Sequence, residues 1–181
     1  MSNQQNGAEW SSFVQKGGYK FKGKADSKLQ IVCGNRTLAW LIVSSRDEAN
    51  KSTSYDLVES ESETGSPAYR FIRTETTLTG VDPKDDQKKF VWERLSSGFG
   101  ELFTGSKWQC GQLTLSQNIV RSLMMWVPRI SWFIPMKYAI TDNGQSCGVV
   151  EGSGRAVTVS DPTKAWEIMA AAIILTEDEV G

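Results

Sequence analysis

The sequence predicts a mainly β fold, an antiparallel barrel or closed sheet with a buried apolar C-terminal helix. Two observations lead to this expectation. Short segments rich in β-branched and aromatic residues recur between clusters of Gly, Pro, Asn and Asp, as in antiparallel strands joined by turns. Near the C-terminus, one segment has the composition of a helix but no polar stripe, and such a helix must be enclosed by other elements.

The expected strands are short and cover most of the chain. They are Tyr19–Lys24, Leu29–Cys33, Thr37–Val43, Ser54–Val58, Tyr69–Leu78, Lys89–Leu95, Lys107–Ser116, Ile119–Val127, Ile130–Thr141, Gln145–Val150 and Arg155–Val159. Side chains alternate between the two faces of a strand. We therefore expect Tyr69 and Phe71 on the buried face of their strand and Arg70 and Arg73 on the other face.

A hairpin is predicted over Met136–Val150. Asp142-Asn143-Gly144 interrupts two apolar runs there. Asn-Gly accepts the positive φ angles of a type I′ turn, which matches the twist of the two flanking strands.

The C-terminal helix has clear start signals. Asp161 can cap the first free amides, and Pro162 suits the first helical position. Thr163–Leu175 follows with strong helix formers, and Ile168–Leu175 is apolar on every side. We expect the helix to end before the acidic tail, because Glu177 and its acidic neighbours oppose the helix dipole. A final strand over Ile173–Glu177 is the alternative.

Length and composition indicate one domain of ordinary globular character. The chain has 181 residues and a net charge of −1. A chain of this length can form one hydrophobic core without disulfides or metal ions to stabilise it. We expect a flexible arm over residues 1–12 and a single β-rich domain over 13–181. The three cysteines lack metal or redox spacing and favour a reducing, cytoplasmic compartment. The sequence shows neither a signal peptide nor a transmembrane segment.

The chain contains no histidine. This composition excludes Ser-His-Asp and Cys-His nucleophile activation and any metal site with histidine ligands. The three cysteines fall within apolar strands, where thiols behave as small buried hydrophobic groups. We therefore expect no enzyme activity, no metal and no cofactor.

The first choice of binding site is a basic stretch early in the chain, which comprises Lys20, Lys22, Lys24, Lys28 and Arg36. On a strand, the first three lysines share one face, while Tyr19 and Phe21 share the other. Such a face can bind the phosphates of lipid headgroups or of nucleic acid. The alternative is a solvated strand face, or a sheet edge that lysines guard against aggregation.

A second candidate is an aromatic cluster with nearby cations. We predict that an interaction surface is formed by Trp126, Arg129, Trp132 and Phe133. Indole rings favour the headgroup boundary of a membrane, and large apolar patches favour association with a partner. Packing of these rings in the core is the alternative.

The C-terminal pattern resembles a known family. The segments that carry the resemblance are Met136-Lys-Tyr-Ala-Ile-Thr-Asp-Asn-Gly144, Gly148-Val-Val150, Val157-Thr-Val159, Asp161 and Ala170–Glu179. This last quarter of the chain resembles the tubby-like C-terminal superfamily, which includes phospholipid scramblases and plant LURP-one-related proteins. The resemblance implies a helix that threads a closed antiparallel barrel, and a lipid-associated or scaffolding role. The chain lacks that family's cysteine-rich segment and shows no matching basic pair, so no residue's role is carried over.

Together these observations predict a non-enzymatic binding or scaffold domain. We expect it to associate with anionic phospholipid headgroups or with a protein partner, at the periphery of a membrane in the cytoplasm. A nucleic-acid-binding or viral capsid-type β protein that uses the same basic strand is the alternative.

Overall fold

The computed structural model describes residues 17–24, 27–59, 65–95, 107–117, 137–151 and 154–177. The expected arm at residues 1–12 and the expected strand Ile119–Val127 lie outside these ranges. The described strands are β1 (Gly17–Lys24), β2 (Lys28–Cys33), β3 (Arg36–Asp47), β4 (Ser52–Val58), β5 (Tyr69–Arg73), β6 (Thr77–Asp82), β7 (Gln87–Leu95), β8 (Lys107–Cys110), β9 (Leu113–Gln117), β10 (Lys137–Asp142), β11 (Gln145–Glu151) and β12 (Ala156–Val159). A 3₁₀ turn, η4 (Pro162–Lys164), leads into α3 (Ala165–Glu177).

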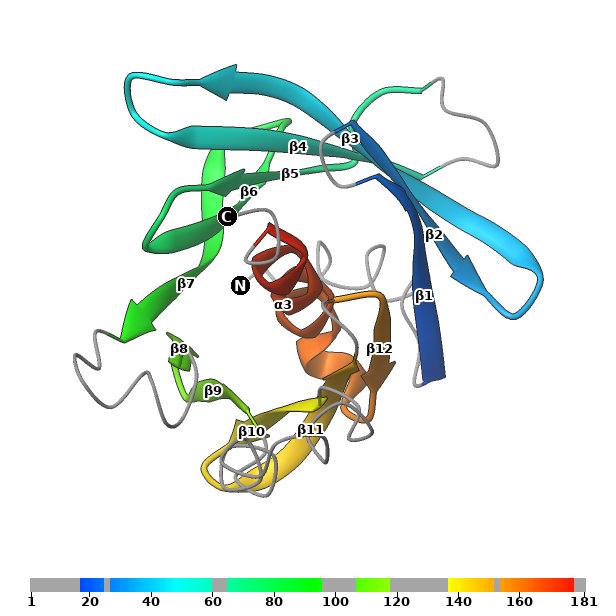
Figure 1. The fold of residues 1–181 in the computed structure, drawn as a ribbon, viewed down its shortest axis with the longest axis vertical. Coiled ribbons are helices and arrows are strands. Elements are labelled where there is room, and N and C mark those ends of the chain that lie inside the picture. Colours follow the sequence, from blue (N-terminus) through cyan, green and yellow to red (C-terminus); the bar gives the residue numbers. More distant parts are fainter. Residues whose placement is uncertain are drawn as a thin grey trace, which may run out of the picture.

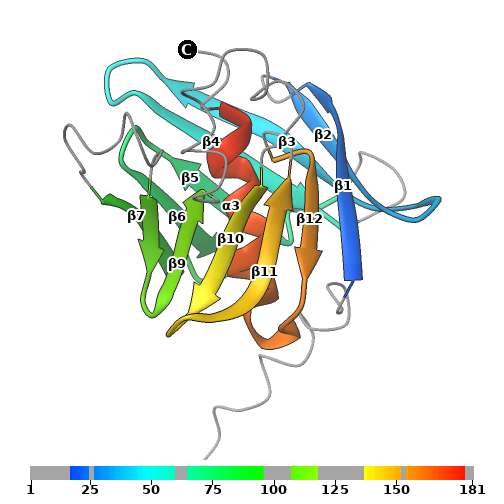
Figure 2. The same cartoon turned by 60° about the horizontal axis from the view of Figure 1, so that its bottom comes forward.

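The twelve strands within the described residues form one closed antiparallel barrel. Each strand pairs with the next one along the chain, and β1 pairs with β12 to close the ring. Figure 1 shows α3 in the middle of this ring, and Figure 2 shows it running behind β10, β11 and β12. The predicted fold class is confirmed.

The helix is enclosed on every side, as its composition predicts. From Ile168 to Leu175 each residue of α3 is at most 3% exposed. The helix contacts β6, β11 and β12. Asp161 caps the 3₁₀ turn η4 that leads into α3, because its carboxylate accepts a hydrogen bond of 2.9 Å from the Thr163 amide, and the α-helix itself begins at Ala165 and not at the expected Thr163. The helix continues to Glu177, so the expectation that it ends before the acidic tail is wrong, as is the alternative of a final strand.

Glycines make room where the helix meets the barrel wall. A Cβ on Gly148 would lie 2.8 Å from the Ile168 side chain, so only glycine lets β11 approach the helix here. Gly154, with φ +76°, faces the Ala172 carbonyl oxygen so closely that a Cβ would overlap it. The close packing of α3 against the barrel wall therefore depends on Gly148 and Gly154, which have no side chains.

Aromatic rings fill the space beside the helix start. Trp166 of α3 stacks on Tyr69 of β5, with ring centroids 5.4 Å apart and an angle of 10°. Tyr69 stacks in turn on Phe90 of β7 at 6.1 Å. The Trp92 indole donates a hydrogen bond of 3.1 Å to the Glu167 carbonyl oxygen. These contacts join the first turn of α3 to the wall formed by β5 and β7.

The predicted hairpin is confirmed. β10 and β11 pair around Asn143 and Gly144, whose φ angles are +48° and +85°. Two consecutive positive φ angles are those of a type I′ turn.

Two segments predicted as single strands are hairpins. Tyr69–Leu78 divides into β5 and β6, because Thr74 Oγ1 accepts a hydrogen bond from the Thr77 amide and closes a turn. Lys107–Ser116 divides into β8 and β9 at Gly111, whose φ is +57°. The Thr74 turn lacks glycine and proline, which explains the first error, whereas the second overlooked Gly111 at the first position of a two-residue turn.

Arg73 and Cys33 also differ from expectation. Arg73 shares the inward face of β5 with Tyr69 and Phe71 and is only 5% exposed. Its guanidinium lies 4.6 Å from the ring centroid of Trp108, an arrangement that stabilises a buried cation. Cys33, expected among buried thiols, is exposed at the last position of β2, whereas Cys110 and Cys147 are buried.

Candidate anion-binding surface

The basic row on β1 has the geometry that alternation predicts. Tyr19 and Phe21 point into the barrel and are 3% and 4% exposed. Lys20, Lys22 and Lys24 are exposed on the outer face. Because alternate residues on a strand are about 6.6 Å apart, the row extends the cationic face over about 13 Å.

The register with β2 extends this row sideways. Lys24 lies directly opposite Lys28, and Lys22 lies opposite Gln30. Directly opposed side chains in an antiparallel pair have Cβ atoms about 5 Å apart, and like charges at that spacing are unfavourable. The register therefore brings two lysines side by side where β1 ends and β2 begins.

A half-buried tryptophan lies beside this end of the row. The Lys28 Nζ lies 5.6 Å from the ring centroid of Trp40 on β3. Trp40 pairs in register with Gln30, so it shares the outer face with the lysines. The surface thus combines cations with one half-buried aromatic ring, whose indole N–H is buried.

Arg36 lies away from the end of the row where Lys24 and Lys28 are opposed. It opens β3 opposite Cys33, at the other end of the β2–β3 hairpin from Lys28. The six residues of β2 separate the two ends by about 17 Å. The structure therefore brings four of the five predicted basic residues into one row and places Arg36 beyond the Lys20 end of that row.

A residue that sequence reasoning missed is Arg155. It precedes β12, and its Nη1 donates a hydrogen bond of 2.6 Å to the Gly23 carbonyl oxygen, between Lys22 and Lys24. The two partners are 132 positions apart in sequence. No local pattern could have joined them, because only the closure of the barrel through β1 and β12 brings them together.

The lysines on β1 differ electrostatically from several others on the barrel. Lys89 pairs with Asp85 at 3.3 Å, and Lys137 pairs with Glu151 at 2.7 Å. Within the described ranges, no carboxylate forms an ion pair with Lys20, Lys22 or Lys24. Their charges therefore project into solvent, where they can meet an external anion.

The second predicted site cannot be placed. Trp126, Arg129, Trp132 and Phe133 all lie outside the described residues. The interface hypothesis at this cluster stays a prediction from the sequence.

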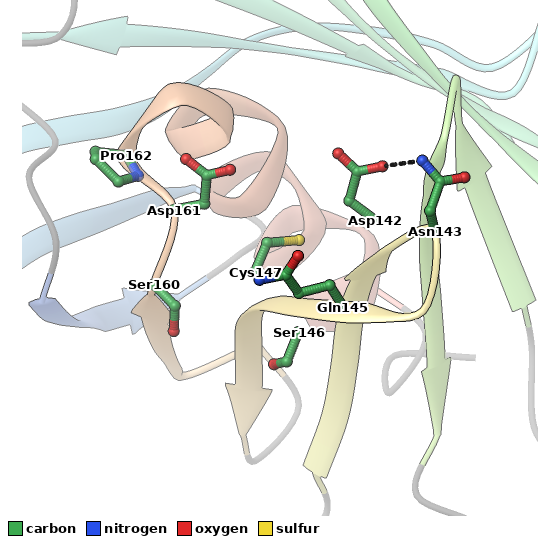
Figure 3. Close-up of a pocket in the computed structure, with 8 residues that line it drawn as sticks. All are labelled: Asp142, Asn143, Gln145, Ser146, Cys147, Ser160, Asp161 and Pro162. Carbon is green, nitrogen blue, oxygen red and sulfur yellow. Dashed lines mark hydrogen bonds between the residues drawn. The ribbon is translucent and has the colours of Figure 1, made fainter.

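A polar pocket of about 470 Å³ opens at the helix-start end of the barrel, between the β10–β11 turn and the connection from β12 to η4 (Figure 3). It is lined by Asp142, Asn143, Gln145, Ser146, Cys147, Ser160, Asp161 and Pro162. Several of these groups already make structural contacts. Asn143 donates to Asp142, and the Asp161 carboxylate caps the helix start, where the Thr163 hydroxyl and amide lower its pKa.

The pocket thiol is poorly suited to nucleophilic chemistry. Burial raises the pKa of Cys147, and its Sγ lies 3.2 Å from the Ile140 carbonyl oxygen, to which it donates. A thiol with a raised pKa holds little thiolate at neutral pH. The described residues also contain no group of three or more Cys, Asp or Glu side chains placed to share a metal ion. Residues of the pocket therefore help to hold the turn that leads into α3.

Comparison with protein-family models, with curated proteins and with solved structures found no match for this chain. No helix in the described part has both the length and the apolar composition needed to cross a bilayer. The fold and the surface define the class by architecture alone: a closed antiparallel β-barrel around a helix, with a basic row on one outer face.

Proposed function

We propose that this chain is a non-enzymatic binding domain that associates with anionic membrane surfaces through the basic row Lys20, Lys22, Lys24 and Lys28. The observation that carries the proposal is the exposed row of Lys20, Lys22 and Lys24 on the outer face of β1. These three lysines form no ion pair with the described carboxylates, and Lys28 of β2 lies opposite Lys24 at the end of the row. An anionic surface that lies along this row would supply the opposite charge.

A membrane is the source of anions that the surface favours. Trp40 lies beside Lys28 on the same outer face, and indole rings favour the headgroup boundary. We place the association at the cytoplasmic leaflet, whose anionic lipids attract basic segments. The enclosed helix supports a relationship with the tubby-like superfamily, which we also put forward as a proposal.

The expected affinity is low. Each lysine near an anionic leaflet contributes about 1 kcal/mol, so the four lysines give about 4 kcal/mol. That free energy corresponds to an affinity of about 1 mM. Association is therefore peripheral, reversible and sensitive to salt, because exposed charges are screened within a Debye length.

The test is sedimentation with vesicles of phosphatidylcholine, with and without phosphatidylserine, at low and at physiological salt. The variant K20E/K22E/K24E should lose binding while its free energy of unfolding changes by less than about 1 kcal/mol, because exposed charges contribute little to folding. The control K51E/K88E/K107E makes the same charge change at exposed positions on other strands and turns. It should retain most of the binding.

Single-stranded oligonucleotides are assayed in parallel. Binding to vesicles alone supports the proposal. Binding to oligonucleotides alone, with a steep dependence on salt, would replace it with the nucleic-acid alternative. If neither binds, the row is a solvated strand face and the proposal is wrong.

A further inference from the structure

The end of β1 is anchored from across the barrel closure. Arg155 Nη1 donates to the Gly23 carbonyl oxygen at 2.6 Å, and the Phe21 amide donates to the Arg155 carbonyl oxygen at 2.9 Å. The register between β1 and β12 ends at Lys20 and Ala156. Both bonds therefore continue the closure of the barrel past the last paired residues, toward Lys22 and Lys24.

This anchor is attached at a weak point of the strand. Gly23 has φ +118°, which side-chain-bearing residues rarely adopt, and a Cβ there would lie 2.6 Å from the Lys28 carbonyl oxygen. A glycine within a strand weakens it, because the residue has no side chain to pack and its backbone is free to move. Without a second contact, the segment that carries Lys22 and Lys24 would depend on β2 alone at this point.

We propose that Arg155 is a positioning residue for the basic row. By holding the Gly23 carbonyl oxygen, it keeps Lys22 and Lys24 opposite Gln30 and Lys28, so that the lysines meet an anionic surface together. Fixing a binding segment in its bound geometry strengthens association, because less conformational entropy is lost on binding. This inference rests on the proposed function of the row.

The competing explanation is that Arg155 acts only as one more positive charge. Its side chain is exposed and carries a full positive charge near the row. The two explanations separate in a variant that loses the anchor but keeps the charge. Thr158 offers the position for such a variant, because it is exposed on the outer face of the neighbouring β12, opposite Gly18 of β1.

The experiment compares the wild-type protein, Arg155→Gln and Arg155→Gln/Thr158→Lys. Each is titrated with phosphatidylserine-containing vesicles at one low salt concentration. Arg155→Gln should bind about tenfold more weakly, because a charge-assisted hydrogen bond that orders the site is lost. The double variant has the wild-type net charge on the same face, yet its binding should stay weak. Hydrogen exchange of the amides in residues 21–24 should be faster in both variants, at unchanged melting temperature.

Three outcomes would overturn the inference. If the double variant regains wild-type affinity, Arg155 contributes charge and not position. If Arg155→Gln binds like the wild-type protein, Arg155 has no part in the site. In both cases the proposed function survives, because the wild-type protein binds. If the wild-type protein does not bind the vesicles, the proposed function fails and this inference fails with it.

Discussion

The two faces of β1 obey different constraints. Tyr19 and Phe21 on the inner face are buried in the core around α3, where packing leaves little freedom. Lys20, Lys22 and Lys24 alternate with them on the outer face and are exposed. The inner face is determined by stability, since apolar burial there drives folding. The outer face contributes little to folding, so its composition is free to serve binding.

The largest predicted effect tests whether the helix behind the inner face of the barrel is fully enclosed. Lysine placed separately at Ala170, Ala171, Ala172 and Ile173 samples four directions about 100° apart around α3. Each residue is at most 2% exposed. Each variant should lose about 3 kcal/mol or more of unfolding free energy, because an unpaired ammonium is buried and a long side chain is forced into close packing.

Denaturant unfolding measures these losses, and Thr158→Lys on the exposed face of β12 serves as the control. One helix variant with near-native stability would show that α3 has a solvent-exposed side. The conclusion that the barrel encloses α3 on every side would then be wrong.

A second prediction tests the close approach of Gly154 to α3 without adding a charge. Gly154→Ala places a Cβ against the Ala172 carbonyl oxygen and 2.8 Å from Thr176 Cγ2, at a φ of +76°. The expected loss is about 2 kcal/mol, from steric overlap and an unfavourable backbone conformation. Gly17→Ala is the matched control, because nothing lies within 4 Å of its Cβ position. Equal melting temperatures for the two variants would contradict the close approach.

A third, smaller effect concerns the half-buried carboxyl of Glu167 in the first turn of α3. Burial raises its pKa above the ordinary 4.5, and this effect outweighs the lowering by its own backbone amide and by Lys164. The folded state therefore binds this proton more tightly than the unfolded state. The ionised carboxylate costs stability at neutral pH, and that cost disappears as pH falls through the raised pKa toward 4.5.

Glu167→Gln should accordingly raise the unfolding free energy at pH 7, and its advantage over the wild-type protein should shrink toward zero near pH 4.5. Glu48→Gln, in the exposed β3–β4 turn, is the control. Denaturant titrations at several pH values measure the difference. An advantage that is constant with pH would show that the carboxyl is not perturbed by burial.

The inner face could be predicted from sequence to a large extent. Continuous apolarity over Ile168–Leu175 requires an enclosing wall, and Asp161 with Pro162 marks the helix start. Asn143-Gly144 predicts its turn because few residues accept two positive φ angles. The errors at Arg73 and at the Thr74 turn arose where a polar residue points inward or a turn lacks glycine and proline.

The outer face could be predicted only in part. Alternation places Lys20, Lys22 and Lys24 on one face, since that is local geometry. The opposition of Lys24 and Lys28 depends on the register of β1 with β2, which the spacing of the residues does not specify. The contact of Arg155 with Gly23 depends on closure between the first and last strands. Long-range register is a tertiary property, so no local signal carried it.

The smallest effect on stability gives the most direct test of the central claim that the outer face serves binding. Lys24→Gln removes one of the two opposed charges on β1 and β2. The unfolding free energy should change by less than about 0.5 kcal/mol, because Lys24 is exposed and forms no ion pair with a described carboxylate. The same change should weaken association with phosphatidylserine vesicles about fivefold, because one lysine contributes about 1 kcal/mol at an anionic surface. In this one variant, affinity should therefore fall while stability stays nearly constant. If affinity is unchanged, or if stability falls together with affinity, the opposed lysines belong to the fold and not to a binding site.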